Sequence, residues 1–338
     1  MKIQVAFCLV VACAWAVDPG VMVTIKETEV QQITKQVLPS LASKFGDITV
    51  PDQSSDHCDL SSITAKISGV DQNTVSINFD QAKNALDIST GNIQVGFSMH
   101  FHCHESFLSV SGDASASGPV SMSTQVELTT ADAGNSLFVP QIAVPGVSIG
   151  LDKNQFSIHL NCHNCPGFIE DALESLIKKF ALDAGRKAAE KALPGEITSN
   201  VNPKLASSYP KSEPVANYDM SFSTALTGPA VVKSDHLELP LDGVAYRTST
   251  GYARSGSPGT LPGMNAGLAE GVQLGVSSFV LNSAFAVAKT IGIPIETNFH
   301  NYTIRGQLDQ SSTSQVQFES GMVKFTGGLD LSVFALNS

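Results

Sequence analysis

The chain has 338 residues, of which 42% are hydrophobic and 15% are charged. This length accommodates two domains or one large elongated domain, and the hydrophobic fraction excludes an intrinsically disordered protein. The 20 Lys and Arg residues are outnumbered by 31 Asp and Glu residues, so the formal net charge is -11. That balance excludes the basic surface that nucleic acid binding requires and disfavours electrostatic docking on anionic membranes.

The N-terminus has the pattern of a secretory signal peptide. Lys2 precedes an apolar run over residues 5–12, and the tripeptide Ala14-Trp15-Ala16 fits a signal peptidase site. We therefore expect residues 1–16 to be removed and the protein to be secreted into the extracellular space. A retained membrane anchor is the alternative, but the run is shorter than the roughly 20 residues that span a bilayer.

Four cysteines remain after the signal peptide: Cys58, Cys103, Cys162 and Cys165. An even number of cysteines in an oxidising compartment predicts two disulfides, with three possible connectivities. Asn301 begins the one N-x-S/T sequon of the chain, which predicts a glycosylated surface position.

The first expected element is an amphipathic helix with Pro39 kinking or ending it. Its apolar stripe consists of Val30, Ile33, Val37, Leu41 and Phe45. A second helix is expected to begin at Pro166, to continue through Ala188 and to stop near Pro194 and Gly195. Its apolar face consists of Ile169, Leu173, Leu176, Ile177 and Phe180.

Between these helices the hydrophobic period changes to two, which predicts antiparallel strands with one face in water. The apolar positions are Ile93, Val95, Phe97, Met99 and Phe101, and then Leu108 with Val110, Val120 with Met122, Val126 with Leu128, and Phe156 with Ile158 and Leu160. The opposite face of this sheet must be covered, and the two helices are the available cover.

Residues 202–214 are rich in Pro, Ser and Lys and predict a linker. Further strands such as residues 237–241 follow, and then a Gly/Ser/Pro-rich loop over residues 255–263. An apolar stretch over residues 274–288 predicts a helix, and two strands are expected before Ser338. This second half repeats a helix-plus-strands order without completing it.

The order of elements and several local motifs resemble the tubular lipid-binding family of bactericidal/permeability-increasing protein, lipopolysaccharide-binding protein and the plasma lipid-transfer proteins. The opening DPGVMVTIKETEVQQ and the stretch LGVSSFVLNSAFAVAKTIGI carry the most specific similarity, together with residues 86–112 and 219–246. The resemblance implies an α+β, elongated tubular lipid-binding fold. It would consist of an antiparallel β-barrel wrapped on long helices, a central sheet and an incomplete second barrel.

Three regions of the mature chain follow from the resemblance: an N-terminal lipid-binding barrel over residues 17–200, a linker and central sheet over 201–250, and a partial C-terminal barrel over 251–338. An apolar pocket between helix and sheet would hold acyl chains, although the same side chains could simply form an ordinary core. The expected lipid-binding residues are Val30, Ile33, Val37, Val95, Phe97, Met99, Phe101, Leu173, Ile177 and Phe180.

The resemblance also implies that Cys58 pairs with Cys103 at the barrel tip, which leaves Cys162 to pair with Cys165. Family members usually join a strand cysteine to one in the long second helix, and this chain departs from that pattern. It departs again at the tip, because no Lys or Arg occurs over residues 84–152. We therefore expect weak recognition of lipopolysaccharide phosphates there.

His100, His102 and His104 lie on one face of the expected strand, and Glu105 follows them. This geometry could serve a metal ion, but alternating histidines on a wet strand face are more often polar surface, so no metal or other cofactor is expected. The Cys162-x-x-Cys165 motif lacks the βαβ context of redox proteins. No nucleophile elbow, phosphate loop or zinc-protease motif is present, and we do not expect an enzyme.

These patterns together predict a secreted protein that holds phospholipid or a similar amphiphile by apolar burial. Two alternatives remain: an innate-defence protein that binds lipopolysaccharide or a membrane surface, and an extracellular metal-binding or structural protein without lipid. An incomplete second barrel would leave an unpaired strand edge, so we also expect either self-association through the C-terminal third or an unusually mobile C-terminal third.

Overall fold

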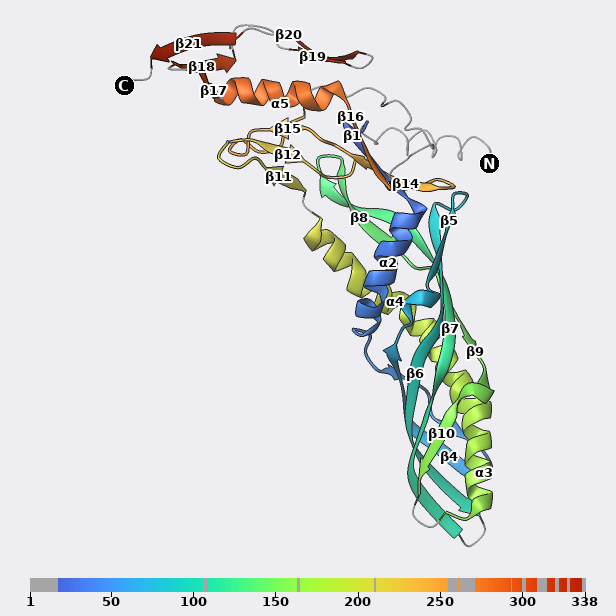
Figure 1. The fold of residues 1–338 in the computed structure, drawn as a ribbon. Helices are drawn as coiled ribbons and strands as arrows, with labels where there is room; N and C mark the ends of the chain where they lie inside the picture. The colour runs from blue at the N-terminus through green and yellow to red at the C-terminus, as the bar shows by residue number, and fades with distance from the viewer. Residues whose placement is uncertain are drawn as a thin grey trace, which may run out of the picture.

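The computed structural model describes residues 18–105, 108–162, 165–209, 211–254, 261 and 271–292, together with five strands between residues 294 and 335. The expected signal peptide and the glycosylation site Asn301 lie outside the described residues. Figure 1 shows an elongated body in which long strands and a long helix run side by side, with smaller sheets at one end.

The body is built on a nine-stranded antiparallel sheet with the main order β10-β7-β6-β4-β2. The strands β8 and β9 also pair with β7, β5 pairs with β6, and β3 pairs with β4. The bounds are β2 Ile48–Thr49, β3 Gln53–Ser54, β4 Cys58–Gly69, β5 Ser76–Asp80, β6 Ala85–Glu105, β7 Leu108–Gly134, β8 Leu137–Ala143, β9 Val147–Leu151 and β10 Ser157–Asn161.

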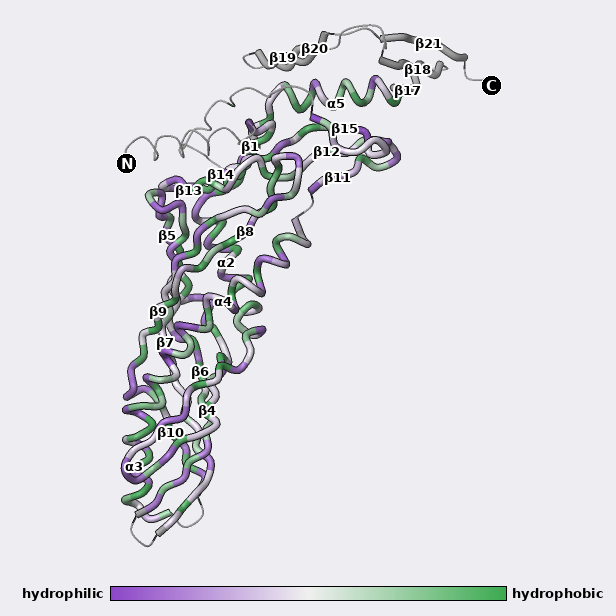
Figure 2. Tube along the Cα trace, turned by 180° about the vertical axis from the view of Figure 1, so that it is seen from behind, coloured by the Kyte–Doolittle hydropathy of each residue, from purple (hydrophilic) through white to green (hydrophobic). Residues whose placement is uncertain are grey.

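The predicted alternation along β6 is confirmed. Phe97, Met99 and Phe101 are buried, whereas the alternating positions Ser98, His100 and His102 are exposed. Hydrophobic and hydrophilic positions follow one another along these strands in Figure 2. The three apolar pairs between residues 108 and 128 do not lie in separate strands, because β7 is one continuous strand of 27 residues that pairs with β6 along most of its length. The expected strand with Ile158 and Leu160 is confirmed as β10.

The expected barrel is not closed by strand pairing in the described part of the chain, because no ladder joins the two ends of the β10-to-β2 path. A long helix lies along the sheet instead (Figure 1). It consists of α3 Gly167–Leu176, a π-helical segment Ile177–Ala181 and α4 Leu182–Ser208. The molecule is therefore an α+β protein in which a long helix packs against antiparallel strands.

The predicted end of this helix near Pro194 is wrong, because α4 continues to Ser208 and includes part of the expected linker. Leu193 and Ile197 are buried on either side of the proline, so packing offsets the backbone hydrogen bond that proline cannot make. Near the helix end, the Asn202 amide accepts a hydrogen bond from Ile142 N at 2.9 Å and donates one to Ile142 O at 3.0 Å. Tertiary contacts thus override the local stop signal.

The first expected helix is α2 Glu27–Ala42, which includes Pro39 and ends three residues after it. The strand β1 Val21–Lys26 precedes it and lies in the middle of a second sheet of order β13-β14-β1-β16. The partners are β13 Val231–Val232, β14 His236–Leu241 and β16 Val272–Val276. The opening segment of the chain thus pairs with residues from its last third.

A three-stranded sheet of β11 Ser212–Pro214, β12 Ser221–Ser223 and β15 Ala245–Tyr246 lies beside these strands (Figure 1). Asp242, which is fully buried, accepts a hydrogen bond from Arg254 Nη1 at 2.6 Å. Burial raises the pKa of this carboxyl group, against the opposing effect of Arg254. Arg254 Nη2 also donates to Asp18 O at 2.7 Å, which ties the N-terminal segment to this region.

The helix expected over residues 274–288 begins later than predicted. Residues 274–276 belong to β16, which pairs with β1, and α5 Ser278–Ile291 follows with Gly292 in the left-handed region at φ 65°. The expectation of two final strands is also wrong, because five are present. They are β17 Pro294–Phe299, β18 Tyr302–Leu308, β19 Gln315–Glu319, β20 Met322–Thr326 and β21 Leu329–Ala335.

Candidate functional site

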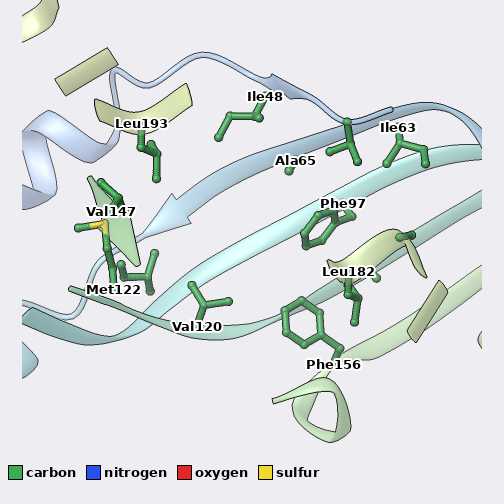
Figure 3. Close-up of a cluster of buried hydrophobic side chains, with 14 of the residues drawn as sticks. Ile48, Ile63, Ala65, Phe97, Val120, Met122, Val147, Phe156, Leu182 and Leu193 are labelled. Atoms are coloured by element: carbon green, nitrogen blue, oxygen red, sulfur yellow. The ribbon is translucent and has the colours of Figure 1, made fainter. Parts of the chain in front are cut away.

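Apolar side chains from the long sheet and from α4 converge on one interior space, which we call the helix–sheet cleft. Figure 3 shows Phe97, Val120, Met122 and Leu193 pointing toward this interior from β6, β7 and α4. The alternation of the strands supplies one wall, and the inward face of α4 supplies the other. The cleft is lined by Ile48, Ala65, Lys66, Ile67, Ile93, Val95, Phe97, Val120, Met122, Ile149, Leu151, Gly185, Arg186, Ala189 and Leu193.

A close contact between α4 and β6 bounds the cleft. The ring of Phe97 packs against Gly185, and its centroid lies 6.1 Å from that of Phe156. Because the walls meet at such contacts, the free volume of the cleft is only about 40 Å³. Ligand pockets usually have roughly 300–1,000 Å³, so an occupant would have to part the helix from the sheet or repack the lining.

A larger open space lies next to the cleft, which we call the β2–α4 groove. It has a volume of about 630 Å³ and shares Ile48 and Leu193 with the cleft, so these two side chains stand between the two spaces. The segment that follows α2 forms one wall and α4 forms the other. The groove is lined by Phe45, Gly46, Asp47, Ile48, Thr49, Pro51, Ala184, Lys187, Ala188, Lys191, Ala192, Leu193 and Glu196.

The expected lipid-binding residues fall into three groups. Val95 and Phe97 line the cleft. Five others belong to the surrounding core: Val30 is partly buried against it, and Met99, Phe101, Leu173 and Ile177 are buried within it. The remaining three, Ile33, Val37 and Phe180, are exposed.

The expectation that Ile33, Val37 and Phe180 face the interior is therefore wrong. Ile33 and Val37 are each 54% exposed, whereas Val30 packs against the core and Ala42 at the end of α2 is buried. Phe180 is 46% exposed because it lies in the π-helical segment. The wider turn there shifts the helical period, and Ala181 and Leu182 take the buried positions.

Several lining residues were missed by the sequence analysis. Val120 and Met122 were recognised as strand positions, and continuing the period-two pattern along β7 would have assigned them to the cleft. Ile48 lies in a strand of only two residues, and Leu193 directly precedes a proline. Neither has a local signal that identifies it as part of a cavity.

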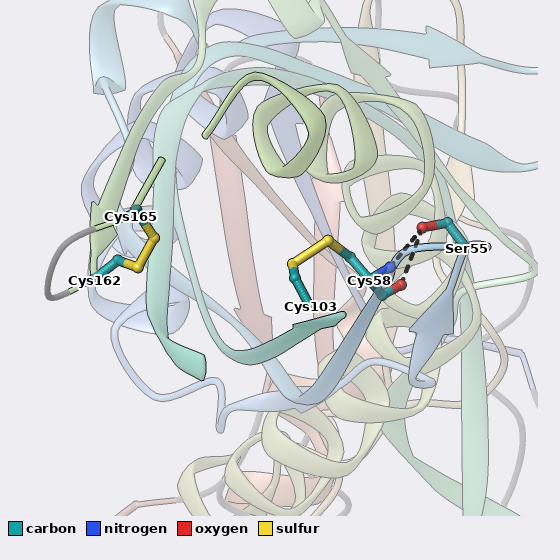
Figure 4. The surroundings of a disulfide bond; sticks show 5 residues. All are labelled: Ser55, Cys58, Cys103, Cys162 and Cys165. Carbon is teal, nitrogen blue, oxygen red and sulfur yellow. Dashed lines mark hydrogen bonds between the residues drawn. A yellow bond between two sulfur atoms is a disulfide. The ribbon is translucent and has the colours of Figure 1, made fainter. Parts of the chain in front are cut away.

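Figure 4 shows both disulfides, whose cysteines lie at or near the ends of β4, β6 and β10 and before α3. Cys58 and Cys103 are direct partners in the β4–β6 ladder, with Cα atoms 4.0 Å apart, and Cys162 is bonded to Cys165 before α3. These are the pairs that the family resemblance implies. Cys58 begins β4, which β2 and β3 precede along the chain.

The histidines of β6 are arranged as polar surface. His100 Nδ1 lies 3.1 Å from an oxygen of Asp113, and the rings of His102 and His104 stack with centroids 6.4 Å apart. Over the described ranges, no group of three or more His, Cys, Asp or Glu residues is placed to hold a metal ion. Nor is any helix in those ranges long and apolar enough to cross a membrane.

These features define an elongated α+β fold in which a long helix covers a long antiparallel sheet over an apolar interior. The crystal structure of lipopolysaccharide binding protein has this fold, with a TM-score of 0.61 and 16% identity, covering 94% of this chain and 75% of that chain. The chain thus has the tubular fold of that protein, and the expected likeness is confirmed.

A second solved structure, Takeout 1 of Epiphyas postvittana, aligns with 51% of this chain and 91% of its own at a TM-score of 0.34 and 13% identity. No protein-family model and no curated protein sequence matches the chain.

Proposed function

We propose that this chain is a secreted, non-enzymatic lipid-binding protein that holds acyl chains of phospholipid or a similar amphiphile in the helix–sheet cleft. The observation that carries the proposal is that the apolar cleft lies next to the open β2–α4 groove, with Ile48 and Leu193 lining both. An acyl chain would enter through the groove and displace these two side chains.

The free energy for such binding comes from burial of the chain itself. Each methylene transferred from water contributes roughly 0.8 kcal/mol, so ten carbons contribute about 8 kcal/mol before the cost of opening the cleft. Met122 is a flexible side chain on the cleft wall that can adapt to different occupants. The fold and the two disulfides suit an extracellular carrier of this kind.

The test is direct identification of bound lipid. The purified protein is extracted with organic solvent, and the extract is analysed by mass spectrometry. In parallel, binding of a fluorescent fatty acyl probe is measured for the wild type, for Ala189→Phe and for Ala206→Phe. Ala189 lines the cleft, whereas Ala206 is exposed near the end of the same helix and is the matched control.

A phenylalanine at position 189 occupies space that an acyl chain needs. Loss of two buried methylenes, roughly 1.6 kcal/mol, lowers the probe affinity by about tenfold. We expect that loss for Ala189→Phe and an unchanged affinity for Ala206→Phe. Equal affinities for both variants, or a wild type that retains no lipid and binds no probe, would overturn the proposal.

A further inference from the structure

The β2–α4 groove carries two lysines of α4 in a protein with an acidic net charge. Lys187 and Lys191 line it, and both are exposed on α4 at a spacing of four residues, which places them on one helix face. In the part of the chain that the structure describes, neither lysine has an ion pair.

The acidic residues of α4 nearest to these lysines are paired elsewhere. Lys153 Nζ lies 2.7 Å from Asp183 Oδ2. Arg186 Nη1 donates to Glu190 Oε1 at 3.0 Å, and the same oxygen accepts a hydrogen bond from Ile149 N at 3.0 Å. These contacts hold both carboxylates on partners other than Lys187 and Lys191.

Two carboxylates, those of Asp47 and Glu196, line the groove itself, and each contacts a polar side chain. Asp47 lies 4.0 Å from Lys66 Nζ, and Glu196 Oε2 accepts a hydrogen bond from Asn200 at 3.4 Å.

We propose that Lys187 and Lys191 bind the anionic head group of the amphiphile whose acyl chain occupies the helix–sheet cleft. The inference rests on the proposed function and narrows its ligand to lipids with a carboxylate or a phosphate head. Each lysine offers three N–H donors, and charge-assisted hydrogen bonds to carboxylate or phosphate oxygens are stronger than neutral ones. The net charge of -11 gives no general attraction for anions, so the selectivity would come from this groove.

The test compares four ligands with the same oleoyl chain and different heads: oleate, oleoyl lysophosphatidic acid, oleoyl lysophosphatidylcholine and monooleoylglycerol. Affinities are measured by displacement of a fluorescent acyl probe from the wild type and from the double variant Lys187→Gln/Lys191→Gln. Lys179→Gln/Lys211→Gln, at exposed positions outside the groove, is the control with the same change in net charge. Thermal unfolding confirms that both variants fold.

We expect the wild type to bind an anionic ligand at least about tenfold more tightly than monooleoylglycerol, as two charge-assisted contacts would allow. The groove variant should lose this preference and keep its affinity for monooleoylglycerol, while the control keeps both. The larger increase in affinity over monooleoylglycerol, for oleate or for lysophosphatidic acid, distinguishes a carboxylate site from a phosphate site.

Binding of all four ligands with equal affinity, or an equal loss for all four in the groove variant, would overturn the head-group proposal and leave the acyl cleft standing. A wild type that binds none of the four would instead overturn the proposed function itself.

Discussion

Gly185 of α4 lies so close to the ring of Phe97 of β6 that a Cβ atom on Gly185 would stand 2.2 Å from Phe97 Cε1. The missing side chain lets the helix backbone approach the sheet directly at the edge of the cleft. Since Phe97 is buried and also packs on Phe156, its ring has little room to move away.

We therefore expect Gly185→Ala to destabilise the fold by about 1–3 kcal/mol through overpacking, despite the gain in helix propensity. Gly195 lies on the same helix, and a Cβ atom there would meet nothing within 4 Å. Gly195→Ala is therefore the matched control. It should stabilise the protein by up to about 1 kcal/mol. Urea denaturation of the two variants measures both effects, and equal stabilisation would contradict the close contact.

The two disulfides should contribute unequally to stability. The Cys58–Cys103 bond closes a separation of 45 residues, whereas Cys162 and Cys165 are separated by 3. In the chain-entropy picture, loss of the long loop costs about 4 kcal/mol and loss of the short one about 2 kcal/mol. Denaturant midpoints of the double alanine variants at each pair test this order, and peptide mapping that joined Cys58 to Cys162 or Cys165 would refute the pairing.

Asn202 should decide whether the last turns of α4 remain helical. Its amide forms both hydrogen bonds to Ile142 of β8, so Asn202→Ala leaves two partly buried backbone groups without their partner and costs about 1–3 kcal/mol. Hydrogen exchange should rise over residues 202–208. Asn200→Ala, whose amide bonds only to Glu196 within the helix, is the control and should leave that protection intact.

We expect titration of Tyr209 to destabilise the fold at alkaline pH. Burial raises the pKa of its phenol to about 12, and its hydroxyl donates to Thr224 O at 2.7 Å. Because the folded pKa lies above the ordinary value of about 10, the stabilising contribution is complete below pH 10 and is lost as the pH rises toward 12. Tyr209→Phe should therefore flatten the fall in stability over this window.

The same phenylalanine variant should lower stability at neutral pH by about 1 kcal/mol, because the Thr224 carbonyl loses its donor. Tyr218→Phe, at a position that is 43% exposed, is the control. Unfolding free energies of both variants at pH 8, 10 and 11.5 separate the loss of the hydrogen bond at neutral pH from the titration of the phenol at alkaline pH. An unchanged alkaline slope in Tyr209→Phe would show that this phenol does not govern it.

The sequence by itself determined the local features that repeat over short distances. The alternation from Ile93 to Phe101 predicted which side chains of β6 are buried, because a strand places successive residues on opposite faces. The stripe from Ile169 to Ile177 likewise predicted the buried face of α3 and of the turn that follows it. The family resemblance added the order of elements and the tubular fold.

Only the tertiary structure decided where these elements meet. Pro194 is a local stop signal, yet contacts of Leu193, Ile197 and Asn202 with the sheet extend α4 to Ser208. The apolar stripe of α2 predicted burial of Ile33 and Val37, but both are exposed, and Val30 and Ala42 are the positions that pack inward. The β2–α4 groove is lined by residues about 140 positions apart in the sequence. A periodic pattern within one segment cannot predict this groove, because its geometry depends on packing between distant segments.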